Sequence, residues 1–131
     1  LGITIDTSAL SSNQRSKAKM NHPLVRWFEH LAIIRNTAAH HARLWNRSFT
    51  PVSTTALRTM SEFDSLAHNQ SEQVYGALTV MNVLLRKLSP STSWPTKVRA
   101  LILDTFSELQ LRHPSEMGCP ENWQDASVWC E

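Results

Sequence analysis

The fold of this chain is decided by the stretch from residue 21 to residue 47, NHPLVRWFEHLAIIRNTAAHHARLWNR. Asn21 is a good N-cap, and Pro23 stands in the first turn, where a missing N–H group costs nothing. The apolar residues that follow recur at spacings of three and four, the period of one face of an α-helix. They are Leu24, Trp27 or Phe28, Leu31, Ile34, Ala38, Ala42 and Trp45. This pattern predicts a helix from about Asn21 to about Arg47, and Pro51 prevents its continuation.

Two further helices are predicted nearer the C-terminus. The first opens at Ser71, carries an apolar face as far as Leu88 and stops before Pro90. The second begins at Ser93, again with a proline in its first turn, and ends at His113.

Two segments lack this regular spacing. Residues 53–68 are rich in Ser and Thr, so we expect an irregular segment there with at most a short helix. The tail from Ser115 onward is too irregular for a helix, and we expect Trp123 and Trp129 to pin it onto the helical body.

The composition agrees with a helical protein. The chain has 131 residues, of which 41% are hydrophobic and only three are glycine, which argues against a turn-rich β fold. We therefore predict one all-α domain over residues 1–131, a helical bundle whose residues 115–131 form a packed C-terminal tail. No long apolar window and no leader-like N-terminus is present, so we expect a cytoplasmic protein without a membrane span. Cys119 and Cys130 lack the spacing of a zinc site, and we expect free thiols.

Charge is distributed unevenly along the chain. Residues 1–50 hold seven Lys or Arg against Asp6 and Glu29, a net charge of +5, whereas residues 51–131 hold six against nine, a net charge of −3. A local positive field of this kind suits a polyanion such as RNA, although a solvated surface gives the same pattern.

The end of the predicted first helix concentrates polar chemistry. On a straight helix Asn36, His40, Arg43 and Arg47 fall on one stripe, whereas Arg35 lies about 140° away from His40. One helix cannot easily bring both side chains to the same atom. A second copy across a two-fold axis could supply the missing partner, so we interpret the set as half of a shared site.

These residue types suit the cleavage of a phosphodiester without a metal. An imidazole can take a proton from a ribose 2′-hydroxyl or return one to the departing 5′-oxygen. Arginine donates to the non-bridging phosphate oxygens as charge builds on them, and the sequence near this stretch lacks the clustered carboxylates that Mg²⁺ prefers. The alternative is that the histidines are ordinary helix residues and the arginines pair with the acidic tail.

Two motifs carry a resemblance to a known family. Arg35-Asn36, three residues and then His40 resemble the Arg-x4-6-His signature of the HEPN superfamily, and RNTAAHHARLWNR resembles its Abi-like (AbiD/AbiF) abortive-infection branch. A second block, MGCPENW at residues 117–123, is similar to the C-terminal Met-Gly-x-Pro-x-x-Trp element of that branch. The resemblance covers about residues 15–129. Family members are usually longer, with an additional N-terminal helical region, so the resemblance implies a C-terminal fragment.

The resemblance implies an all-α HEPN-like bundle and a homodimer with a composite active site. It implies a metal-independent endoribonuclease of bacterial phage defence, without a cofactor, that leaves 2′,3′-cyclic phosphate and 5′-hydroxyl ends. By the same carry-over Arg35 and His40 are the catalytic pair, joined by Asn36. The extension of the motif is assigned to RNA-phosphate contacts or to helix packing, and these residues are His41, Arg43, Asn46 and Arg47. An antitoxin or regulatory RNA is a further partner that the family suggests.

Two alternatives stay open from the sequence. The same arginines could grip a structured RNA in a non-catalytic binding module, or the helices could form a purely structural dimerisation module. Solvent access to His40 separates a reacting imidazole from one that is buried in an interface.

Overall fold

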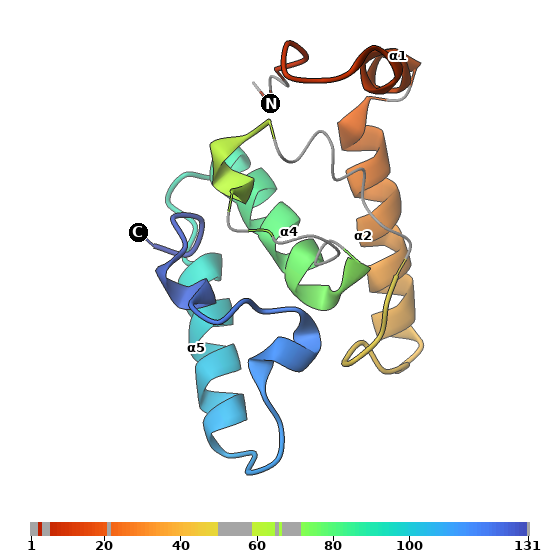
Figure 1. The fold of residues 1–131 in the computed structure, drawn as a ribbon. Coiled ribbons are helices and arrows are strands. Elements are labelled where there is room, and N and C mark those ends of the chain that lie inside the picture. Colours follow the sequence, from red (N-terminus) through yellow and green to blue (C-terminus); the bar gives the residue numbers. More distant parts are fainter. Residues whose placement is uncertain are drawn as a thin grey trace.

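The structure, a computed structural model, is all-α in the part of the chain that it describes, which is residues 3, 6–20, 22–49, 59–64, 66 and 72–130 (Figure 1). These residues form four α-helices and three short 3₁₀ helices, and no strand. The α-helices are α1 (Ser12–Met20), α2 (Pro23–Ala39), α4 (Val74–Leu88) and α5 (Trp94–Ser107). The 3₁₀ helices are η1 (Ser61–Phe63), η3 (Pro114–Met117) and η4 (Trp123–Asp125). The predicted fold class, all-α, is confirmed.

Helix α2 ends at Ala39, so the predicted extension to Arg47 is wrong. The N–H of His41 donates to the carbonyl of Ala38 at 3.0 Å, and the N–H of Ala42 donates to that of Thr37 at 3.1 Å. His41 has φ 52°, in the left-handed region. These two bonds around a left-handed residue form a Schellman motif, which closes the helix by satisfying its last carbonyl groups.

The other helices begin close to their predicted starts. Helix α4 begins at Val74 rather than Ser71, which lies outside the described residues, and ends at Leu88 as predicted. Helix α5 has the predicted N-cap Ser93 but ends at Ser107 instead of His113. The Ser107 hydroxyl donates to the Asp104 carbonyl at 2.7 Å, a local bond that competes with continued helix.

One helix was not predicted from the sequence, and one segment is described only in part. Helix α1 was not predicted, and it buries none of its side chains, so it lacks the apolar period from which the other helices were predicted. Of the segment 53–68, only residues 59–64 and 66 are described, and they contain η1. Residues 53–58, 65, 67 and 68 lie outside the described part. No helix in the described part has the length and apolarity that a bilayer crossing requires.

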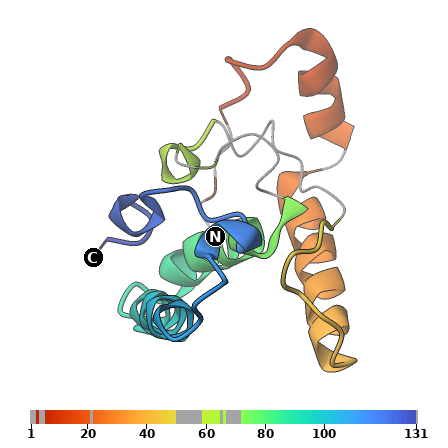
Figure 2. The same cartoon turned by 60° about the horizontal axis from the view of Figure 1, so that its bottom comes forward.

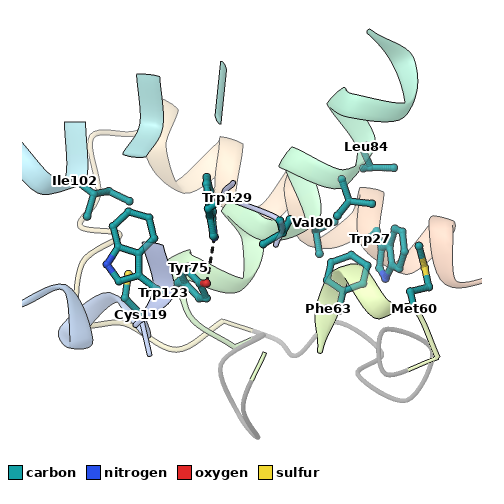
Figure 3. Packing of buried hydrophobic residues seen from close by; sticks show 12 residues of the cluster. Trp27, Met60, Phe63, Tyr75, Val80, Leu84, Ile102, Cys119, Trp123 and Trp129 are labelled. Carbon is teal, nitrogen blue, oxygen red and sulfur yellow. Dashed lines mark hydrogen bonds between the residues drawn. The ribbon is translucent and has the colours of Figure 1, made fainter. Parts of the chain in front are cut away.

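Helix α4 lies at the centre of the molecule, between α2 on one side and α5 on the other (Figures 1 and 2). Its Tyr75 and Val80 are fully buried in the core cluster, where the Tyr75 ring lies against the rings of Trp123 and Trp129. Trp27 of α2 is fully buried and meets Phe63 of η1 edge to face, with ring centroids 5.6 Å apart (Figure 3). Burying such large aromatic surfaces supplies much of the driving force for folding.

The C-terminal tail is fastened to α4, as predicted from its tryptophans. Trp123 and Trp129 are 3% and 2% exposed and pack edge to face on each other. The Trp129 indole N–H donates to the Tyr75 hydroxyl at 3.1 Å, the dashed line in Figure 3. The Asn82 side-chain amide donates to the Val128 carbonyl at 2.6 Å. The tail is therefore part of the core.

Candidate functional site

The predicted catalytic residues all lie at the C-terminal end of α2. Arg35 and Asn36 are in its last turns and His40 is its C-cap, and all three side chains are exposed to solvent. The Arg35 guanidinium donates from Nη1 to Oδ1 of Asn36 at 3.0 Å. Among the described residues the structure shows no hydrogen bond between Arg35 and His40, as expected for side chains about 140° apart on a helix. The structure thus brings together Arg35 and Asn36 and leaves His40 apart from them.

The four predicted RNA-binding residues lie beyond the helix. Because α2 ends at Ala39, the expected stripe of Asn36, His40, Arg43 and Arg47 on one helix face does not exist. His41 and Asn46 both have positive φ values, 52° and 47°, which turn the chain back on itself. All four side chains are exposed on this connection, so they can reach a ligand that approaches the end of α2.

Part of the first motif has a role in the fold. The Trp45 ring stacks on Phe106 of α5, with centroids 4.6 Å apart, and this contact holds the connection against the helical body. The Arg47 guanidinium lies 5.6 Å from the centre of the Phe49 ring, which is buried. This cation–π contact engages Arg47 before any ligand binds.

The second motif, residues 117–123, also has a role in the fold. Gly118 has φ 89°, and a Cβ atom on it would lie 2.9 Å from Gln73 Cβ, so only glycine fits there. Cys119 and Trp123 are buried in the core, and burial raises the pKa of the Cys119 thiol from 9.0 to about 12. Both cysteines are free thiols, as expected, with Cys130 exposed. The structure therefore buries Gly118, Cys119 and Trp123 of this block and exposes Glu121 and Asn122.

Solvent-exposed apolar side chains accompany the candidate site along α2. Val25, Phe28 and Ile33 are 51%, 54% and 41% exposed. The apolar spacing allows either Trp27 or Phe28 in the core, and the structure buries Trp27 and exposes Phe28. At about 100° per residue, Val25, Phe28 and Ile33 fall on the same half of the helix as Arg35 and Asn36. The sequence pattern did not predict this exposed apolar surface. The apolar residues of α2 spread too widely around the helix for one buried face, and this width could have indicated it.

The positive charges near the end of α2 are not neutralised by the described carboxylates. Ion pairs among the described residues join Arg26 to Glu29, Lys87 to Glu62 and Arg112 to Glu116, and none of them involves Arg35, Arg43 or Arg47. The alternative in which these arginines pair with the acidic tail is therefore not seen in the described structure. A helix C-terminus carries partial negative charge, so an incoming phosphate needs such guanidinium groups to approach it.

Other potential sites lie elsewhere or are absent from the described part. A pocket of about 450 Å³ lies between Ser61, the last turn of α4 and Val128, and no predicted site residue lines it. Among the described residues, no group of three or more His, Cys, Asp or Glu side chains could hold a metal ion. Comparison of the chain with protein-family models, with curated proteins and with solved structures gave no significant match in any of the three.

Proposed function

We propose that this protein is a metal-independent endoribonuclease whose active site is built from the C-terminal end of α2 and completed by a second copy of the chain. The observation that carries the proposal is the joint exposure of Arg35, Asn36 and His40 at one helix end, with Arg35 engaged only by Asn36 among the described residues. The setting proposed from the two motifs is abortive infection in bacterial phage defence, with an antitoxin or regulatory RNA as a further partner.

The proposed reaction is an internal transesterification of RNA. The His40 imidazole takes the proton of a ribose 2′-hydroxyl, and the 2′-oxygen attacks the adjacent phosphorus. The bond from phosphorus to the 5′-oxygen then breaks, and that oxygen takes a proton from an imidazolium. The products are a 2′,3′-cyclic phosphate and a 5′-hydroxyl. Arg35 donates to the non-bridging oxygens, where negative charge accumulates.

The geometry of α2 supports the proposal of a second copy. Arg35 and His40 diverge by about 140° around the helix, so one protomer does not direct both side chains at one phosphate. The face beside them exposes Val25, Phe28 and Ile33, and an apolar helix face of this kind suits helix-to-helix packing. A two-fold pairing through this face would place Arg35 of one copy near His40 of its partner.

The test is RNA cleavage by purified protein, with product ends identified. His40→Ala and Arg35→Ala should abolish cutting, whereas His113→Ala and Arg112→Ala, which change exposed residues of the same types away from α2, should not. Activity in excess EDTA is expected to persist. Cutting by His40→Ala at the wild-type rate would exclude the proposed chemistry, and RNA binding without any cutting would favour the non-catalytic module.

A further inference from the structure

The basic half of the chain keeps its charge in the folded structure. Its two carboxylates are both engaged locally: Asp6 accepts from the N–H of Ser8 at 2.8 Å, and Glu29 pairs with Arg26 at 2.9 Å. The hydrogen bonds from Ser8 also lower the pKa of Asp6, and this favours its ionised form. Asp6 also interacts electrostatically with Arg15 of α1, but neither carboxylate forms an ion pair with Lys17 or Lys19.

Helix α1 is a basic element that contributes nothing to the core. Its sequence, SNQRSKAKM, holds Arg15, Lys17 and Lys19 without an acidic residue, and none of its side chains is buried. Arg15 is used to hold the chain that precedes the helix. Its Nε donates to the Leu10 carbonyl at 2.9 Å, and its Nη2 donates to that of Ser8 at 2.8 Å.

Lys17 and Lys19 have no such structural role. Both are exposed, and the described part of the chain offers neither of them an ion pair or hydrogen bond. A short helix without packing is marginally stable in water. The two Arg15 bonds tie the first turn of α1 to the preceding residues Ser8 and Leu10, and the Leu10 side chain is buried. The two ammonium groups are therefore held on an anchored element and are available to a ligand.

We propose that α1 is an RNA-binding arm in which Lys17 and Lys19 contact phosphates of the strand that is cut at the far end of α2. The proposal rests on the proposed function, since it takes the RNA as given. Helix α1 joins the N-terminal end of α2, and Arg35, His40 and Arg43 lie at the other end (Figure 1). An α-helix rises about 1.5 Å per residue, so the 17 residues of α2 separate the two basic clusters by about 25 Å.

RNA fits this helix better than a lipid surface does. An interfacial membrane helix needs a broad apolar face opposite its basic face. Apart from Ala18 and Met20, every residue of α1 is polar or charged. Electrostatic contacts to a phosphate backbone require no apolar face.

The separation of the two clusters sets a length requirement. With about 3.4 Å per nucleotide, a stacked strand reaches from His40 to α1 over about seven nucleotides. A tetranucleotide can occupy the site at the end of α2 but cannot touch α1 at the same time. The contribution of Lys17 and Lys19 should therefore appear only with longer RNA.

The test measures binding of labelled single-stranded RNA 4-mers and 12-mers to His40→Ala protein between about 50 and 200 mM salt. In that background Lys17→Gln/Lys19→Gln is compared with the matched pair Lys97→Gln/Arg112→Gln, which changes two exposed cations of the other half. Glutamine has nearly the helix propensity of lysine, so α1 is retained. Each lost phosphate contact makes the negative slope of log K against log salt shallower by about 0.7. For the Lys17→Gln/Lys19→Gln protein we therefore expect a slope shallower by about 1.4 with the 12-mer and an unchanged slope with the 4-mer.

Three results would overturn the proposal in different ways. An unchanged 12-mer slope for the α1 pair, with binding intact, would reject the arm and leave the nuclease standing. If the Lys17→Gln/Lys19→Gln protein lost binding to anionic phospholipid vesicles while its RNA affinity was unchanged, α1 would be assigned to a membrane surface. If His40→Ala protein binds no RNA and the wild type cuts none, the proposed function itself fails, and the arm fails with it.

Discussion

Arg35 donates a hydrogen bond of 3.0 Å from Nη1 to Oδ1 of the neighbouring Asn36 on the exposed side of α2. Adjacent residues on a helix point about 100° apart, so this contact requires the guanidinium to bend toward the amide. Such a bond restricts the long side chain of Arg35 before a phosphate arrives. A neutral amide does so without cancelling the positive charge.

Asn36→Ala is expected to lower the cleavage rate about tenfold or more while changing RNA affinity much less, because it frees the guanidinium to leave its productive orientation. Asn36→Asp should be at least as harmful, because a carboxylate would pair with Arg35 and compete with the phosphate. Single-turnover cleavage and equilibrium binding separate the two effects. Asn122→Ala, which changes an exposed asparagine of the tail, serves as the control. Equal loss of binding and turnover would show that Asn36 does not orient Arg35.

The left-handed conformation of His41 leads to a prediction about stability. A non-glycine residue at φ 52° costs about 1 kcal/mol relative to one that adopts this region freely. His41→Gly should therefore raise the free energy of unfolding by about 0.5–1 kcal/mol, despite the greater entropy of glycine in the unfolded chain. Ala42→Gly, one residue later and outside the left-handed region, should lower it. Thermal unfolding of both variants checks this, and stabilisation by neither would argue against the Schellman ending.

His41 and Ala42 also show why only part of the fold could be predicted from the sequence. The apolar period identifies α2, α4 and α5 because each buries one face against the core. The end of α2 escaped prediction because its closing residue is His41, not the glycine or asparagine that marks most such endings. Helix α1 escaped because it buries nothing, so no periodicity exists to find.

The candidate site was predictable only where it lies on regular helix. Helical spacing placed Asn36 on a polar side of the helix, and the structure exposes it there. Arg43 and Arg47 could not be placed, because residues with positive φ redirect the chain beyond the helix. His41 precedes both arginines, and Asn46 directly precedes Arg47. The exposure of Phe28 was open for a different reason, since Trp27 and Phe28 each fit the apolar pattern and only packing decides between them.

The hydrogen bond between Trp129 and Tyr75 should be measurable as a coupling between the tail and α4. Tyr75→Phe leaves the buried indole N–H of Trp129 without its 3.1 Å acceptor, which should cost about 1–3 kcal/mol of unfolding free energy. In a Trp129→Phe background, the same substitution should cost clearly less, because the donor is already absent. Chemical denaturation of the wild type, the two single variants and the double variant completes this double-mutant cycle. Equal costs in both backgrounds would mean that this bond contributes nothing to stability.

The two cysteines should differ in reactivity and in their effect on stability at high pH. Burial raises the pKa of the Cys119 thiol to about 12, so at pH 8 a thiol reagent should label Cys130 rapidly and Cys119 only after denaturation. The unfolded chain loses the Cys119 proton from about pH 9.0, whereas the folded chain retains it to about 12. The contribution of this thiol to stability is therefore complete below pH 9.0 and falls as the pH rises toward 12. In Cys119→Ala protein this part of the decline should be absent, and rapid native labelling of Cys119 would contradict its burial.

Phe28 tests whether the exposed face of α2 joins two copies of the chain. The side chain is 54% exposed, so Phe28→Glu should leave the fold intact and change the melting temperature little. If α2 pairs with α2 across a two-fold axis, each new carboxylate is buried in an apolar contact close to the axis, and the dimer should dissociate.

Leu101→Glu, at a leucine of α5 that is 65% exposed, places the same charge on a surface outside the proposed interface and should leave the dimer unchanged. Light scattering during size-exclusion chromatography gives the mass of each variant, and cleavage is measured on the same fractions. A monomeric Phe28→Glu protein without activity, beside a dimeric and active Leu101→Glu protein, is the expected pair of results. A wild type that is monomeric and still cuts RNA would mean that one copy of α2 is sufficient for catalysis.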